Sequence, residues 1–394
     1  MIALFLVFPV QGTAPDLTRS WVEEVRGGET AFPALFRGPR GKPWLSLTSL
    51  ENEEVPMLLA GPVTTGVKLE VFAQASGRDW FLNWTDFAGG AALEDGTLAW
   101  YWLERSSDPH SYATRFSVRP GMLRDLNERP SEPSEPRPIE EHRGPGEHGF
   151  VSLVALDEKH FLALWLDGRA TSTGGDTQLL ARTVAPDGAL GPEMVVDSRT
   201  CSCCPTALAR LADGEMLAAW RDCSEDQVRD IALARFDGES WSEPALLNTD
   251  GWKIDGCPVN GPRIAVGAKH VAVAWYTGAD ASVRVAFAGP EARDFAKPLR
   301  VDDGAPEGRG DAAFLADGSL LVGWLEHEEG RSSWRVRRVW PDGRQGPSLV
   351  VAEVGSSRSS GLLRMLADGN GALLAWTETE PVRRVVVGFV GPTR

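Results

Sequence analysis

The sequence predicts an all-β protein that folds as a single closed β-propeller of four-stranded blades, with seven blades expected and six as the alternative. Three observations favour this fold: a tryptophan-ended phrase recurs along the 394 residues, 42 glycines supply turns, and each repeat has room for four strands. Hydrophobic residues make up 42% and charged residues 24% of the chain. This balance is typical of globular proteins and excludes a disordered chain or a multi-span membrane protein.

The recurring phrase sets the repeat length. Four copies carry an Asp-Gly pair and three lack it; they end at Leu47 (RGPRGKPWLSL), Trp102 (ALEDGTLAWYW), Trp165 (DEKHFLALW), Trp220 (LADGEMLAAW), Trp275 (GAKHVAVAW), Trp324 (LADGSLLVGW) and Trp376 (LADGNGALLAW). The gaps between these anchor residues are 55, 63, 55, 55, 49 and 52 residues. Seven copies at this spacing indicate a repeat architecture.

Each repeat reads as four strands. Asp-Gly is a favoured pair for a two-residue hairpin, and segments such as DIALARF and FAKPLRVDDG supply a third and a fourth strand. Four antiparallel strands in about 50 residues are typical of a propeller blade. The last repeat stops after its third strand, so we expect WVEEVRGG, at 21–28, to complete it and leave no open edge. Residues 128–146, rich in Pro and Glu, predict an extended, solvated loop.

The first residues predict export to the periplasm or the medium. Residues 2–10 form an apolar run that is too short to cross a bilayer as a helix, and Val10-Gln11-Gly12 resembles a cleavage site. We therefore expect a signal peptide at 1–14 and a propeller domain at 15–394, with a buried first strand as the alternative for the apolar run. No other segment could span a membrane. The net charge of −15 is a poor match for nucleic acid, and we expect a monomer.

The repeat register brings distant residues to one face. In a propeller the first strand of each blade lines the central channel, so the residues that begin these strands should form a polar funnel. The acidic residues after the anchors are expected to cap loops through hydrogen bonds. Candidate catalytic residues in the funnel are Asp86, Glu147 and Arg309. Candidate ligand-binding residues are Trp84, His148, Arg221, Asn260, Arg263 and Arg358.

The cysteines gather at the same face. Cys201, Cys203 and Cys204 begin the fourth blade, and Cys257 holds the equivalent place in the fifth. In an exported protein they could form disulfides between adjacent blades. They could instead bind copper or zinc, with His148 as a further ligand, or act as a redox dithiol. No motif requires a cofactor.

The phrases AFPAL, RDWFLNW, EHGFVSL and GCPVNGP, with fourth strands such as DGESWSEP, resemble the sialidase superfamily. The similarity covers about residues 31–390 and is greatest to bacterial exported BNR-repeat proteins of the exo-α-sialidase-like type. It implies a propeller, export and a glycan ligand. A sialidase would also have three arginines that bind the substrate carboxylate, a Tyr nucleophile assisted by Glu, and an Asp acid/base. Here Ala31 stands where the first of these arginines would be, and the last tyrosine is Tyr276, in the fifth of seven repeats.

Three functions are therefore open. The first is a propeller that binds, and in its enzymatic form hydrolyses, a glycan at the funnel. The second is a metal or thiol protein centred on the four funnel cysteines. The third is a non-catalytic interaction platform, because propellers serve many functions.

Overall fold

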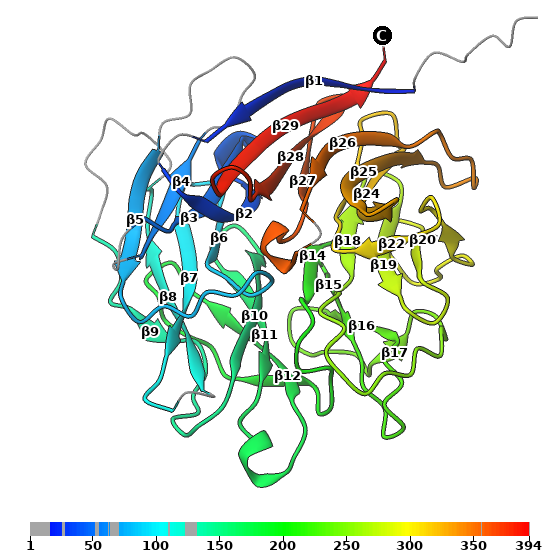
Figure 1. Ribbon diagram of the computed structural model, residues 1–394. Helices are drawn as coiled ribbons and strands as arrows, with labels where there is room; N and C mark the ends of the chain where they lie inside the picture. Colours follow the sequence, from blue (N-terminus) through cyan, green and yellow to red (C-terminus); the bar gives the residue numbers. More distant parts are fainter. Residues whose placement is uncertain are drawn as a thin grey trace, which may run out of the picture.

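The computed structural model describes residues 16–25, 28–51, 55–61, 63, 71–108, 111–122, 132–355 and 357–393. Seven antiparallel sheets surround a central channel, which confirms the seven-bladed propeller (Figure 1). The helices of this part of the chain are three 3-10 turns, η1 (Pro39–Gly41), η2 (Thr171–Thr173) and η3 (Arg358–Ser360). None of them could cross a membrane. The signal peptide predicted at 1–14 lies outside the described residues.

The first four blades follow the chain in order, and each has its strands in sequence from the channel outward. Blade 1 contains β2 (Thr30–Arg37), β3 (Pro43–Ser49), β4 (Val55–Ala60) and β5 (Val71–Gly77). Blade 2 contains β6 (Gly89–Ala92), β7 (Leu98–Arg105), β8 (Tyr112–Arg119) and β9 (Arg137–Pro138). Blade 3 contains β10 (His148–Ala155), β11 (Phe161–Asp167), β12 (Gln178–Val184) and β13 (Met194–Asp197). Blade 4 contains β14 (Ala207–Arg210), β15 (Met216–Arg221), β16 (Ile231–Phe236) and β17 (Ala245–Leu246).

Blades 5 to 7 complete the ring. Blade 5 contains β18 (Arg263–Val266), β19 (Val271–Thr277), β20 (Ser282–Ala288) and β21 (Leu299–Arg300). Blade 6 has a divided inner strand and contains β22 (Pro306–Gly308), β23 (Ala312–Phe314), β24 (Leu320–Glu328), β25 (Arg331–Val339) and β26 (Leu349–Val354). Blade 7 contains β27 (Arg364–Asp368), β28 (Gly371–Glu378), β29 (Arg384–Pro392) and the N-terminal β1 (Leu17–Glu24).

The predicted closure by an N-terminal strand is confirmed, although the strand begins at Leu17 rather than Trp21. β1 pairs with β29 from Leu17↔Pro392 to Glu24↔Val386, with one irregularity. In Figure 1, β1 (dark blue) lies along β29 (red), so the two ends of the described chain meet in one blade. This pairing covers the outer edge of β29, which would otherwise be free to pair with another chain.

The hydrophobic core lies between neighbouring blades. Every anchor residue predicted from the repeat is on the second strand of its blade and is buried. Trp165 of blade 3 packs with Phe116 and Val118 of blade 2, and Trp220 of blade 4 packs with Leu164 of blade 3. Because each anchor packs on the preceding blade, the phrase recurs for reasons of packing and not for ligand binding.

The acidic residues after the anchors are structural where they meet an indole. Trp165 donates its indole N–H to Asp167 at 3.0 Å, and Trp324 donates to Glu326 in the same way. These contacts satisfy polar groups that are buried inside the ring, as the expected capping role requires.

The expectation of a solvated loop at 128–146 is wrong for part of that segment. Arg137–Pro138 form β9, the outer strand of blade 2, and the next two residues, Ile139 and Glu140, are 1% and 2% exposed. Proline is tolerated in an edge strand because its missing N–H faces outward. Proline content alone therefore concealed the fourth strand of this blade.

Candidate functional site

Seven equivalent residues, one from each blade, form a ring around the channel. In six blades the ring residue pairs with the residue directly before the anchor, as Arg263 does with Ala274 and Arg364 with Ala375. In blade 6 the ring residue is Asp311, whose carbonyl accepts the Gly323 N–H at 2.9 Å. In blade order the ring consists of Ala34, Gly89, Ser152, Ala207, Arg263, Asp311 and Arg364. Blades 1 to 4 thus contribute small side chains, and blades 5 to 7 contribute three charged ones.

This asymmetry creates a cavity of about 220 Å³ inside the channel. All seven ring residues line it, together with Asp86, Tyr101 and Phe150. The small side chains of blades 1 to 4 leave this space open, and the charged side chains of blades 5 to 7 face it from the other side of the channel. Most small-molecule sites have volumes of at least about 300 Å³, so this smaller cavity suits one terminal group of a ligand.

The cavity carries two unpaired positive charges. Within the described part of the chain, neither Arg263 nor Arg364 forms an ion pair, and the Arg364 Nε has no hydrogen-bond partner. The Arg263 Nε donates to the Gly310 carbonyl at 3.3 Å. Burial, with repulsion from Arg263 as the second cause, lowers the pKa of Arg364 to about 9. Burial lowers the pKa of Arg263 as well, although attraction by Asp311 opposes that shift.

The Asp311 carboxylate lies between these arginines in the ring and is held by the backbone. Its oxygens accept the N–H groups of Ala312 and Met365, each at 2.9 Å. Two guanidiniums face this one carboxylate, so the cavity has an excess of positive charge while Asp86 is protonated. Buried charges are normally paired, so this arrangement favours an anionic ligand.

Asp86 adds a titratable group to the same cavity. Its side chain is 2% exposed, accepts the Phe150 N–H at 2.8 Å, and accepts the Tyr112 hydroxyl at 3.1 Å. Burial raises the pKa of Asp86 to about 7, against these two hydrogen bonds, which lower it. A carboxyl that titrates near neutral pH can act as a general acid.

Asp86 also has a structural role, because its contact with Phe150 is repeated elsewhere in the ring. In each case a side-chain oxygen of one blade accepts the backbone N–H of a positive-φ residue near the inner-strand start of the next blade. The three pairs are Asp86 with Phe150 (φ 53°), Asn260 with Arg309 (φ 58°) and Thr377 with Phe32 (φ 59°). We call these contacts the inter-blade latches. The amide oxygen of Asn260 accepts the hydrogen bond in one latch, as the carboxylate of Asp86 does in another.

Two predicted ligand-binding residues are used by the fold instead. Arg221 is 1% exposed, and its guanidinium donates to the backbone carbonyls of Asn260, Arg229 and Tyr276 at 2.6–2.8 Å. Asn260 donates to the carbonyls of Pro258 and Glu307 as well as accepting the Arg309 N–H. The structure therefore gives Arg221 and Asn260 positioning roles between blades, and their contact with a ligand stays a prediction.

Three more predicted residues lie together where η3 meets the loops that precede the inner strands. The Arg309 guanidinium stacks 4.7 Å from the Trp84 ring and pairs with Glu307 at 3.3 Å. It also donates to the carbonyl of Ser357, next to Arg358, which is exposed in η3. Trp84 and Arg309 thus join blade 2 to blade 6, but neither lines the cavity of Asp86.

Glu147 and His148 begin blade 3 and differ in environment. Glu147 is exposed and lines a second pocket of about 460 Å³ between blades 3 and 4. His148 is 3% exposed and faces Asp167, with 3.1 Å between Nδ1 and a carboxylate oxygen. The structure thus brings Asp86 and Arg263 into one cavity and places Glu147 in the neighbouring pocket. Catalysis by Asp86, Glu147 and Arg309 stays a prediction.

The cysteines gather only in part. All five are free thiols; Cys201, Cys203 and Cys204 lie with their sulfurs within 4.8 Å of one another. Cys257 is exposed, and neither it nor His148 belongs to this group. The expected disulfide between blades 4 and 5 is therefore not confirmed, because no cysteine pair is at bonding distance.

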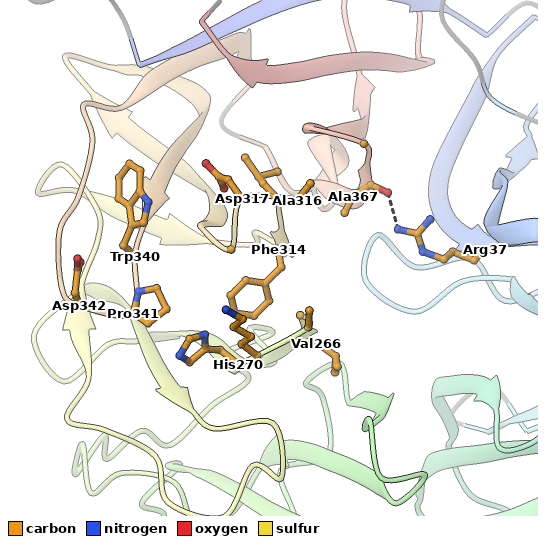
Figure 2. Close-up of a pocket in the computed structure, with 16 residues that line it drawn as sticks. Arg37, Val266, His270, Phe314, Ala316, Asp317, Trp340, Pro341, Asp342 and Ala367 are labelled. Carbon is orange, nitrogen blue, oxygen red and sulfur yellow. Dashed lines mark hydrogen bonds between the residues drawn. The ribbon is translucent and has the colours of Figure 1, made fainter.

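A larger pocket of about 660 Å³ lies on the opposite face, where the hairpin turns of blades 5 to 7 meet (Figure 2). Figure 2 shows Trp340, His270 and Phe314 around it, with Arg37 donating to the Ala367 carbonyl at 2.6 Å. Its acidic residues already have partners: Asp342 pairs with Arg344, and Asp317 pairs with Arg338. Its basic residues, Arg37 and Lys269, are exposed to solvent, whereas the channel arginines are half-buried.

Sequence reasoning missed Asp311 and Arg364, although a signal was present. Arg263 and Arg364 precede their anchors, Trp275 and Trp376, by the same number of positions. A shorter count back from each anchor, to the middle of the inner strand rather than to its start, would have found both arginines. The same count from Trp324 reaches the residue after Asp311. It would therefore have indicated Asp311 as a neighbour of the two arginines in the ring.

No protein-family model matches the chain, and no curated protein matches its sequence significantly. Solved structures do resemble it. The BP39L lectin from Burkholderia pseudomallei is 11% identical with a TM-score of 0.64, over 93% of this chain and 98% of the lectin. The polysaccharide lyase Uly1 is 10% identical with a TM-score of 0.53, over 98% and 94% of the two chains. The α-L-arabinanase of Penicillium chrysogenum, complexed with arabinobiose, is 11% identical with a TM-score of 0.50, over 94% and 98%. At these identities the shared property is the fold.

Proposed function

We propose that this propeller binds an acidic glycan by placing the carboxylate of a terminal sugar between Arg263 and Arg364. The observation that carries the proposal is the pair of half-buried guanidiniums that face one cavity without an ion-pair partner among the described residues. A guanidinium binds a carboxylate through two parallel hydrogen bonds, and this geometry favours a planar anion. The carboxylate would supply the charge that Asp311 only partly provides.

The remaining lining suits a sugar ring. Asp86 can exchange hydrogen bonds with hydroxyl groups, and the small residues of blades 1 to 4 leave room beside the charged ones. The similar structures include a lectin, a polysaccharide lyase and an arabinanase, and this supports a glycan ligand for a propeller of this shape. The cavity volume of about 220 Å³ limits the buried part to one terminal group.

Hydrolysis is the second candidate function, favoured by the pKa of about 7 of Asp86. In its protonated form Asp86 would donate its proton to the leaving-group oxygen of a glycoside held by the two arginines, while a water molecule attacks the anomeric carbon as the glycosidic bond breaks and passes its proton to solvent. Glu147, in the pocket between blades 3 and 4, and Arg309, between the two parts of the inner strand of blade 6, are the other two residues predicted to take part in catalysis. A fluorogenic glycoside of an acidic sugar tests this function, and the loss of turnover in Asp86→Asn is the expected result.

We also propose that the protein is exported after removal of residues 1–14 and acts as a monomer. The apolar run before Gly12 supports the first part, and the closure of the ring by its own N-terminal strand supports the second. Intact-mass spectrometry of the protein from a periplasmic extract tests both, under denaturing and then native conditions. A full-length mass would contradict export, and a doubled native mass would contradict the monomer.

Calorimetric titration tests the binding proposal. The probes are methyl α-sialoside and methyl β-glucuronide, with methyl β-glucoside as the uncharged control. We expect an acidic sugar to bind at least tenfold more tightly than the glucoside, and Arg364→Gln to remove this preference. Arg344→Gln, a change to an exposed arginine on the opposite face, should leave binding unchanged. Equal binding of charged and uncharged sugars by the wild type would overturn the proposal.

A further inference from the structure

A cluster of three thiols lies apart from the channel cavity. Cys201, Cys203 and Cys204 form it, in the loop between β13 and β14; we call it the three-thiol cluster. The Cys201 sulfur is 3.4 Å from that of Cys204 and 3.9 Å from that of Cys203. The loop is fixed to the neighbouring strand, because the Cys201 N–H donates to the Arg221 carbonyl at 3.0 Å.

The 3.9 Å separation of the Cys201 and Cys203 sulfurs matches two ligands of one metal ion, and the 3.4 Å separation of the Cys201 and Cys204 sulfurs is much longer than a disulfide bond. A metal–sulfur bond of about 2.3 Å places sulfurs on one ion about 3.8–4.0 Å apart, whereas a disulfide needs about 2.05 Å. We propose that the three-thiol cluster binds one copper(I) ion through the sulfurs of Cys201, Cys203 and Cys204. On binding, each thiol releases its proton to solvent, and the copper(I) keeps its oxidation state.

The number of ligands favours copper(I) over zinc. Thiolates are soft ligands that select copper(I), zinc and iron–sulfur clusters. Structural zinc sites are almost always four-coordinate. Among the residues that the structure describes, no fourth histidine, cysteine or carboxylate atom joins the three sulfurs. A three-sulfur site therefore suits an ion that accepts three-fold coordination.

Buried positive charge beside the cluster suits an anionic complex. Three thiolates with one copper(I) carry a net charge of −2. The Arg229 guanidinium, in a residue that is 9% exposed, donates to the Cys201 sulfur at 3.1 Å. Arg221, 1% exposed, supplies a second guanidinium that is held in place by its three carbonyl contacts. These two charges would offset the charge of the complex inside the fold.

The cluster is also accessible. The pocket of about 460 Å³ between blades 3 and 4 is lined by Thr200, Ser202 and Arg229, which flank or contact Cys201. Cys203 is half-buried, whereas Cys201 and Cys204 are 1% and 2% exposed. The partly exposed Cys203 is therefore the member of the cluster that an ion would meet first.

The test is a copper(I) titration of the reduced full chain under anaerobic conditions, in competition with bicinchoninate. We expect the wild type to bind one copper(I), with an extended X-ray absorption fine structure that shows three sulfurs at about 2.3 Å. Cys203→Ser should weaken binding at least a hundredfold. This residue is chosen because its partial exposure makes the change the least disruptive to packing, and an unchanged thermal transition should confirm the fold. Cys257→Ser, a matched change to an exposed cysteine, should bind copper as the wild type does.

Three results would overturn the proposal. One is equal copper binding by the wild type and Cys203→Ser. Another is a disulfide within the cluster in protein isolated without reductant, found by peptide mapping. The third is uptake of one zinc ion by these cysteines in preference to copper(I). Each of these results leaves the sugar-binding test unaffected, because that test needs no metal and concerns another cavity.

Discussion

Replacing Asp86 by asparagine should make the stability of the protein less dependent on pH. The change keeps the latch to Phe150, because the amide oxygen can accept the same N–H, as the amide of Asn260 does for Arg309. It removes only the group whose pKa is raised by burial to about 7 from a usual value of 3.8. The expected effect is therefore electrostatic and not a loss of packing.

The sign and size follow from proton binding. A carboxyl whose native pKa is raised stabilises the fold in its protonated form at low pH, and this contribution is lost as the pH rises through 7. At pH 5 the native group is protonated and the unfolded one is mostly ionised. Two pH units below 7, at 1.36 kcal/mol each, correspond to at most about 2.7 kcal/mol. The wild type should lose about this much free energy of unfolding, relative to Asp86→Asn, between pH 5 and pH 8.

Urea unfolding followed by tryptophan fluorescence at pH 5 and pH 8 measures this difference. Asp226→Asn, a change to an exposed aspartate, controls for the general loss of one negative charge. A stability difference between wild type and Asp86→Asn that is the same at both pH values would contradict a raised pKa of Asp86 in the folded protein. So would a variant that is less stable than the wild type at pH 8, because the latch would then require the charge.

Two further predictions concern the ring itself. Trp165→Ala should lower the free energy of unfolding by about 3–5 kcal/mol, because the fully buried indole packs on blade 2. Chemical denaturation measures this loss. A loss below about 1 kcal/mol would contradict the packing role of Trp165. A chain that starts at Val25 lacks β1, so the outer edge of β29 has no partner strand. Light scattering should show that this chain associates as its concentration rises, whereas a chain that starts at Asp16 should not associate. Equal scattering from both chains would contradict closure by β1.

The fold could be predicted because packing repeats along the chain. The anchors from Leu47 to Trp376 occupy the same position between successive blades. The number of anchors therefore gives the number of blades. The short strand at Arg137–Pro138 could not be found in this way. It has two residues, and its register comes from pairing with β8 rather than from any pattern of its own.

The site was less predictable because it depends on differences between repeats. Two of the predicted site residues, Asp86 and Arg263, line the channel cavity, but counting back from the anchors did not identify Arg364. Whether a polar residue faces a cavity or donates to a carbonyl depends on neighbouring blades. Arg221 shows this, since all its carbonyl partners lie outside its own strand. Cys201, Cys203 and Cys204 lie in one loop, so their nearness could be predicted from the sequence. Cys257 lies in another blade, and its separation from the three thiols depends on how the two blades are arranged.

A crystal structure of the protein with methyl β-glucuronide or methyl α-sialoside would show directly whether the two channel arginines bind an acidic sugar. We predict that the sugar carboxylate lies between Arg263 and Arg364, with its oxygens about 2.8 Å from both guanidiniums. A sugar bound instead in the Trp340 pocket of the opposite face, or one that turns an uncharged edge toward the two arginines, would contradict it.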